Sequence, residues 1–210
     1  METANRICSE VRSRFREQVP ALSLDDTDWR RFEFASRLVR GRSAADIGTG
    51  HGVMIHILDK MGRHDRIAAV DIKTHSQALR IDGVNYIEKS IAAEDWDVPA
   101  SDTVICMEVL EHLEAKFNPI MLKNLRSIAK ERLVLTVPFN EPEPLWWHDK
   151  PGGHRQKFTL EKLGELFPSA IATIQPRYGV EWVFVVEDKD MRLNGFRMVP
   201  KNDFLNMLEM

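Results

Sequence analysis

The sequence predicts an α/β fold built on a seven-stranded, mostly parallel sheet with helices on both faces and a C-terminal antiparallel hairpin. From Ser43 onward, short apolar runs alternate with stretches of helical length, which is typical of parallel strands joined by helices. A glycine-rich turn follows the first apolar run. The last two runs, 171–175 and 182–187, are too close in sequence for a parallel crossover, so they can pair only antiparallel.

Residues 1–42 precede the alternating pattern, and we predict that they form a helical cap of two helices. Apolar residues recur at helical spacing on both sides of Pro20. The acidic run 25–28 is typical of a helix start, because its side chains can cap the first free N–H groups. The cap is expected to present a solvated outer face, or else to close over a substrate as a lid.

Residues 43–190 are predicted to form the main domain, and residues 191–210 a tail with one turn of helix. Short apolar runs bounded by turn residues predict strands, and longer runs with helical periodicity predict helices. The expected strands are 44–47, 66–72, 85–88, 103–109, 132–137, 171–175 and 182–187. The expected helices are 53–61, 74–80, 119–130 and 159–167.

The composition is that of an ordinary globular protein, with 210 residues, 43% hydrophobic and 29% charged. The net charge of −3 argues against a general nucleic-acid binder, although a local basic patch is compatible with it. Two cysteines provide neither a disulfide framework nor a metal motif. Neither a signal-peptide core nor an apolar run of membrane-spanning length is found, so we expect a cytoplasmic protein without a membrane partner. The sequence leaves the oligomeric state open.

The run Asp46-Ile-Gly-Thr-Gly-His-Gly52 follows the first expected strand and precedes a helix. Its glycines allow a tight turn and the close approach of a ligand, and the helix offers free N–H groups. Its spacing departs from the dinucleotide fingerprint Gly-x-Gly-x-x-Gly, and the Gly-Lys-Ser/Thr of a phosphate loop is absent. Asp71 ends the second strand, where its two oxygens can accept both hydroxyls of a ribose. The pattern therefore predicts a nucleoside ligand that lacks a pyrophosphate.

The Asp-x-Gly-x-Gly-x-Gly run with Asp71, followed by Glu-Val-Leu-Glu-His at 108–112, resembles the class I S-adenosylmethionine-dependent methyltransferases. The resemblance extends over about residues 43–187. It implies a Rossmann-like fold, S-adenosylmethionine as the cofactor, and methyl transfer as the reaction. These motifs are specific for the fold family and say little about the acceptor.

The resemblance also implies which residues bind the cofactor. They would be Asp46, Gly48, Gly50 and Gly52 for the methionine moiety, Asp71 for the ribose, Ile72, Ser90 and Ile91 for the adenine, and Met107 and Glu108 for the reactive end. The family often carries an acidic residue where Ser90 stands, so the chain departs from the family pattern at the adenine.

We expect the acceptor to bind beyond the carboxyl ends of the strands, as ligands do in open α/β sheets. The segment 138–158 lies there and contains many prolines and glycines, so it is predicted to be a long loop. Adjacent tryptophans favour packing over disorder. Trp146, Trp147, His148 and Arg155 are therefore predicted to bind the acceptor, with Arg155 placed to pair with an anionic group.

The predicted acceptor is a small molecule that is methylated on a hydroxyl, with an amine as the second choice. Methyl transfer from a sulfonium is a direct displacement, and it needs a base when the acceptor is a hydroxyl. Histidine titrates near neutral pH and is the usual base. His112 and His154 belong to the segments expected around the acceptor, and we predict that one of them is catalytic.

Alternative functions involve a metal, a partner or a different cofactor. The Glu-x-x-Glu-His segment with a later histidine is similar to small-RNA 3′-end 2′-O-methyltransferases, in which a metal binds the terminal ribose hydroxyls. The ligands would be Glu108, Glu111, His112 and His154. Because the segment also occurs in metal-free enzymes and the chain lacks a basic surplus, our prediction assigns no metal and disfavours RNA. A non-catalytic protein that binds a partner through the tryptophan loop, and a nicotinamide-dependent oxidoreductase, are further alternatives.

Overall fold

The computed structural model describes residues 2–73, 78–143, 145, 150–176, 181–191 and 193–209. Its strands are β1 (Ser43–Ile47), β2 (Arg66–Asp71), β3 (Asn85–Glu88), β4 (Ser101–Met107), β5 (Ala129–Phe139), β6 (Ile171–Pro176), β7 (Glu181–Asp188) and β8 (Arg197–Met198). Its α-helices are α1 (Glu2–Gln18), α2 (Asp26–Leu38), α3 (Val53–Met61), α4 (Asn118–Ile128), α5 (Leu160–Leu166) and α6 (Lys201–Glu209). Among these described helices, none combines the length and the apolar character needed to cross a membrane.

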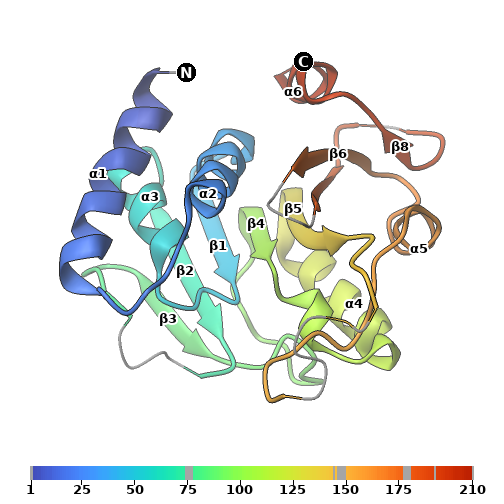
Figure 1. Cartoon of the computed structure of the whole chain (residues 1–210), viewed down its shortest axis with the longest axis horizontal. Helices are drawn as coiled ribbons and strands as arrows, with labels where there is room; N and C mark the ends of the chain where they lie inside the picture. The colour runs from blue at the N-terminus through green and yellow to red at the C-terminus, as the bar shows by residue number, and fades with distance from the viewer. Residues whose placement is uncertain are drawn as a thin grey trace.

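The strands form one sheet in the order β3-β2-β1-β4-β5-β7-β6-β8 (Figure 1). The first five strands of this order are parallel, whereas β7 is antiparallel to both β5 and β6. The chain leaves β1 toward β2 on one side and reaches β4 on the other, so the direction of the connections reverses between β1 and β4. In open α/β sheets, ligands bind at such a switch point, outside the carboxyl ends of the strands.

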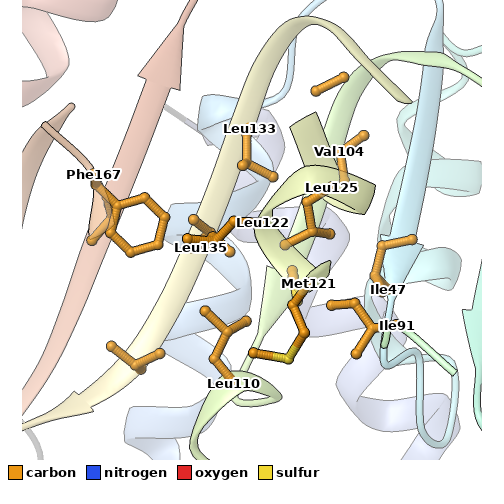
Figure 2. Close-up of a cluster of buried hydrophobic side chains, with 14 of the residues drawn as sticks. Ile47, Ile91, Val104, Leu110, Met121, Leu122, Leu125, Leu133, Leu135 and Phe167 are labelled. Carbon is orange, nitrogen blue, oxygen red and sulfur yellow. The ribbon is translucent and has the colours of Figure 1, made fainter. Parts of the chain in front are cut away.

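One face of the sheet is covered by α4 and α5. Val104 of β4 and Leu135 of β5 belong to the same buried cluster as Leu122 and Leu125 of α4 (Figure 2). Because side chains alternate along a strand, the intervening residues point to the other face. The central strands β4 and β5 are apolar on both faces, so helices must cover both faces of the sheet.

The other face is covered by α2, α3 and α6. Ile105 of β4 and Val134 of β5 lie in one cluster with Phe34 of α2, Leu58 of α3 and Phe204 of α6. The Phe34 side chain is only 2% exposed, so its packing removes a large apolar area from water. This packing holds the second helix of the N-terminal segment directly against the sheet.

The helix α1 packs on α3 rather than on the sheet. Val11 and Phe15 of α1 share a buried cluster with Val53 and Ile57 of α3. The second helix begins at a capping box, in which the Asp25 side chain accepts from the amides of the first turn. Both helices are thus fixed beside the turn that precedes α3.

The C-terminal residues contain more structure than the expected single turn of helix. The helix α6 spans nine residues, and the Phe204 ring stacks on Phe34 with centroids 5.9 Å apart. The buried guanidinium of Arg132 donates to Asp188 at 2.9 Å and to the Leu208 carbonyl at 3.1 Å, which caps the end of α6. The helix forms because its apolar face is buried by distant elements, a contact that local periodicity does not show.

Other predicted boundaries also change. An eighth strand, β8, pairs with β6 at the sheet edge. The predicted helix over 74–80 falls partly outside the described residues, and the described part, 78–80, is not helical. The fourth strand ends at Met107 rather than at 109, because Glu108 has a φ of +54° and leaves the extended conformation.

Replacing Leu125 by alanine is expected to lower the free energy of unfolding by about 2–5 kcal/mol, since it leaves a cavity in a fully buried position. Urea denaturation followed by circular dichroism measures the change. Lys123→Ala, on the exposed side of the same helix, is the control and should have little effect. Equal effects of the two substitutions would contradict the packing described for α4.

Candidate active site

The turn between β1 and α3 holds three glycines in the left-handed backbone conformation. Their φ values are 76° at Gly48, 53° at Gly50 and 87° at Gly52. A Cβ on Gly48 would lie 2.2 Å from Cγ2 of Val109, so this position needs glycine for space as well as for its backbone angle. The Gly48 amide donates to the Val70 carbonyl at 2.7 Å, which fixes the turn against β2.

Asp71 lies at the carboxyl end of β2 and faces this turn. Its Oδ2 accepts a hydrogen bond from the Gly50 amide at 2.8 Å. The Asp71 side chain also lines a cavity of about 330 Å³, together with Ile72, Ser90 and Ile91. The structure therefore brings together the glycine turn, the carboxylate expected at a ribose and the three residues expected at an adenine.

One end of this cavity, formed by the residues expected at an adenine, lies at the protein surface. Ile72 is 75% exposed, whereas Ile91 is buried in the core below. The Ser90 hydroxyl accepts from the Ala92 amide at 3.2 Å and shapes the loop after β3. An exposed isoleucine at the edge of a cavity can cover one face of a flat apolar ring, and burying both surfaces would stabilise the complex.

A second cavity, of about 160 Å³, shares the lining residue Gly48 with the first. Its floor is formed by residues at the ends of the central strands and by the glycine turn, including Asp46 and Met107. The other wall comes from the N-terminal segment and comprises Leu22, Leu24, Arg31 and Phe32. The cap therefore contributes directly to a cavity at the carboxyl ends of the strands.

Asp46, at the end of β1, is only 3% exposed and lines this second cavity. Burial, with a smaller contribution from the negative charge of Asp71, raises the pKa of Asp46 to about 7. The carboxyl is therefore close to half ionised at neutral pH. A cation that entered the cavity would favour the ionised form and would bind to it more tightly than to an exposed carboxylate.

Glu108 follows β4 and has a φ of +54°, an unusual conformation for a residue with a side chain. The hydroxyl of Thr136 donates to its Oε1 at 3.0 Å, and the indole N–H of Trp182 donates to its Oε2 at 2.8 Å. The guanidinium of Arg31 is 3.1 Å from the same Oε2 and 4.3 Å from the Trp182 ring centroid. Two strands, β5 and β7, and the cap thus converge on this one carboxylate.

A cluster of two histidines and two glutamates lies beside this network. Nδ1 of His154 is 2.6 Å from Oε2 of Glu141, and both side chains are buried. The rings of His112 and His154 meet edge to face with centroids 5.1 Å apart. Glu111 is 1% exposed, and both its oxygens have no hydrogen-bond partner among the described residues.

Burial favours the uncharged forms of two members of this cluster, Glu111 and His112. Burial raises the pKa of Glu111 well above its usual value, and the charge of Glu108 raises it further. Burial lowers the pKa of His112, and the neighbouring His154 lowers it further.

Glu111, His112 and His154 offer one ligand atom each within 4.8 Å of one another, so the cluster could hold a metal ion. Glu108 is directed toward Arg31 and Trp182 and is not part of this set.

The segment after β5 is fixed to the short helix Leu110–His112. The Arg155 amide donates to the Glu111 carbonyl at 2.6 Å, and the Gln156 side chain donates to the Leu110 carbonyl at 2.6 Å. The side chain of Arg155 is exposed and donates to the Lys150 carbonyl at 3.1 Å, so its role toward an acceptor stays a prediction. Trp146, Trp147 and His148 lie outside the described residues.

Two residues of the site were not singled out by the sequence. Arg31 is one of many arginines in the N-terminal segment, and nothing local distinguishes it. Glu141 stands in the Pro-Phe-Asn-Glu-Pro run, where a glutamate reads as an ordinary loop residue. Both acquire their roles from contacts with residues distant in sequence, Glu108 and His154.

The sequence profile of the family described as "Methyltransferase domain" matches residues 15–170. The chain belongs to this family. It is a class I S-adenosylmethionine-dependent methyltransferase, as the glycine turn and the acidic residue after β2 imply. No curated protein sequence matches this methyltransferase.

Solved structures of methyltransferases share its fold. The Burkholderia thailandensis 1,6-didemethyltoxoflavin-N1-methyltransferase, with bound 1,6-didemethyltoxoflavin and S-adenosylhomocysteine, is 19% identical with a TM-score of 0.60, covering 90% of this chain and 89% of that one. The methyltransferase domain of bacterial CtHen1-C is 16% identical with a TM-score of 0.59, covering 74% and 95%. An O-methyltransferase family protein from Burkholderia thailandensis is 13% identical with a TM-score of 0.60, and the match spans 77% of this chain but only 56% of that longer one.

The residues of this methyltransferase fit S-adenosylmethionine. At Gly48 a side chain would collide with Val109, and the Gly50 amide donates to Asp71. The backbone of the turn is therefore open to the close approach of a ligand. A cavity with a ribose-accepting carboxylate and apolar neighbours lies on one side of the turn, and a smaller cavity with Asp46 lies on the other. An adenosine and an amino-acid group joined through sulfur would occupy the two cavities.

Asp46→Asn is expected to weaken the binding of S-adenosylhomocysteine by about tenfold at pH values above about 7. In the unchanged protein, raising the pH through about 7 ionises Asp46, so the affinity for a ligand that carries an ammonium group should rise. In the variant this rise should disappear. Titration calorimetry on either side of neutral pH measures both effects.

Asp59→Asn, an exposed carboxylate on α3, is the matched control and should leave the affinity and its pH dependence unchanged. An affinity that rises with pH equally in the Asp46 variant would show that another group is responsible.

Proposed function

We propose that this methyltransferase transfers a methyl group to a hydroxyl of a small-molecule acceptor, and that His154 removes the hydroxyl proton. The observation that supports this proposal is the buried contact of 2.6 Å between His154 Nδ1 and Glu141 Oε2. A carboxylate can only accept, so Nδ1 donates and the basic lone pair lies on Nε2. A carboxylate that orients a histidine in this way is a recurrent arrangement in general-base catalysis.

The acceptor would lie where the two histidines and the cofactor cavity adjoin. His112 lines the larger cavity, and its ring contacts the His154 ring. A hydroxyl oxygen becomes an effective nucleophile only as its proton leaves, whereas a neutral amine needs no base at that step. The buried His154, oriented by Glu141 and in ring contact with the more exposed His112, therefore supports a hydroxyl acceptor over an amine.

When bound, S-adenosylmethionine would supply an electrophilic methyl group: the bond from the acceptor oxygen to the methyl carbon would form as the carbon–sulfur bond breaks, and S-adenosylhomocysteine would leave. Glu141 holds the His154 ring in position, and His154 takes the proton of the acceptor hydroxyl. The His112 ring contacts the His154 ring edge to face and lines the larger cavity. Met107 and the strained residue Glu108 form the floor at the ends of the central strands, between the cofactor cavity and the cap. The chain's contribution is thus alignment and one proton transfer.

A second candidate function uses the same cluster to hold a divalent cation that binds the 2′ and 3′ hydroxyls of an RNA 3′ end. Two observations favour it. Glu111 is buried with both oxygens lacking a partner among the described residues, a costly arrangement unless the carboxyl is neutral or a cation is nearby. His154 also contacts Glu141 through Nδ1, and a carboxylate in this position commonly orients a histidine that binds a metal through its other nitrogen. The likeness to the bacterial CtHen1-C domain is compatible with this candidate.

His154→Gln is expected to lower kcat by about 10²- to 10⁴-fold, because the proton acceptor is lost. Binding of S-adenosylhomocysteine should change little, since His154 is not among the residues that line the cofactor cavities. The rate of S-adenosylhomocysteine release with a panel of hydroxyl and amine acceptors measures kcat, and calorimetry measures binding.

His64→Gln, a partly buried histidine beside Arg63, is the matched control and should retain full activity. An active His154 variant would remove the proposed base. Activity restricted to amine acceptors would contradict the hydroxyl assignment, and cofactor binding without turnover on the whole panel would favour a non-catalytic role.

A chelator separates the two candidate functions. If the histidine cluster acts as a base on a small molecule, saturating EDTA should leave the rate unchanged. If it holds a cation, EDTA should abolish methylation of a short RNA, and added divalent metal should restore it. The same RNA with a 3′-terminal 2′-deoxyribose is the control and should never be methylated. RNA methylation that persists in EDTA would rule out the cation.

A further inference from the structure

Arg31 of α2 reaches from the cap into the smaller cavity beside the glycine turn. Arg31 is 7% exposed and lines this cavity together with Asp46, Gly48 and Gly50. The guanidinium lies 4.3 Å from the Trp182 ring centroid, a distance at which a cation is attracted to the ring face. Arg31 is therefore held rigidly at a place that the cofactor's amino-acid group would enter.

The smaller cavity is lined by one acidic and one basic side chain, Asp46 and Arg31, which match the two charges of the cofactor's amino-acid group. The amino-acid group of S-adenosylmethionine carries an ammonium and a carboxylate, and Asp46 provides a partner for the ammonium only. Burying the carboxylate without a cation would be costly in a cavity of low dielectric constant. Among the described residues that line the cavity, Arg31 is the one whose side chain carries a permanent positive charge.

The hydrogen bonding of Arg31 leaves room for a further acceptor. Nη1 is 3.1 Å from Oε2 of Glu108, and Nη2 is 3.6 Å from Oδ1 of Asp28. Nε is buried and has no hydrogen-bond partner among the described residues. A carboxylate is the acceptor that best fits a guanidinium, because it can take two of its N–H groups at once.

We propose that Arg31 binds the α-carboxylate of S-adenosylmethionine and that Glu108 and Trp182 position its guanidinium for this contact. The cap is then part of the cofactor site, and the cofactor ties α2 to the glycine turn. Asp46 then binds the ammonium and Arg31 the carboxylate of one amino-acid group, from opposite walls of the cavity. The specificity for a cofactor with an intact amino-acid carboxylate resides in Arg31.

The test compares Arg31→Met with the unchanged protein for two ligands that differ only in the carboxylate: S-adenosylhomocysteine and its decarboxylated analogue. The unchanged protein should bind S-adenosylhomocysteine about 10- to 100-fold more tightly, which corresponds to one charged hydrogen-bonded contact. Arg31→Met should lose this preference, so that its affinity for S-adenosylhomocysteine falls by about the same factor while that for the analogue changes little. Calorimetry with each ligand gives the four constants.

Arg30→Met removes the neighbouring exposed arginine and is the matched control, with both affinities unchanged. An equal loss for both ligands would show that Arg31 only supports the fold, and no loss would show that it does not touch the carboxylate. If Arg31→Met fails to fold, Arg31→Lys and the unchanged protein still decide the question. Equal binding of both ligands by the unchanged protein would overturn the proposal.

Discussion

The carboxylate of Glu108 is the point on which the geometry of the site depends. It accepts from Thr136 on β5 and Trp182 on β7, and it pairs with Arg31 on α2. These contacts require the left-handed backbone at Glu108, because an extended residue would continue β4. A single side chain thus links the central strand β5, the antiparallel strand β7 and the cap helix α2, and the surrounding fold provides the energy that keeps its backbone strained.

The same crowding explains the glycine turn. Val109 follows Glu108, and its side chain occupies the space that a Cβ on Gly48 would need. The ends of β1 and β4 therefore approach so closely at Gly48 that this position must lack a side chain. Gly48 lines both cavities, so a ligand that crosses this glycine would contact both.

The site contains groups that are unfavourable for stability. Asp46 and Glu111 are buried carboxyls, and the oxygens of Glu111 have no partner among the described residues. Such groups cost free energy unless they are neutral or meet an opposite charge. The apolar clusters on both faces of the sheet offset this cost, as Figure 2 shows for the side of α4. A ligand with complementary charges would relieve it at the site itself.

The sequence by itself determined the alternating β and α elements, the closing hairpin and the cofactor turn, because each is encoded by local periodicity or by a contiguous motif. Tertiary structure alone decided that Arg31 faces Glu108, that Glu141 orients His154, and that α6 forms on Phe34. A local pattern specifies which face of an element is apolar, but not which distant partner covers it. The charge pairs of this site join residues far apart in the chain, so only the folded sheet brings them together.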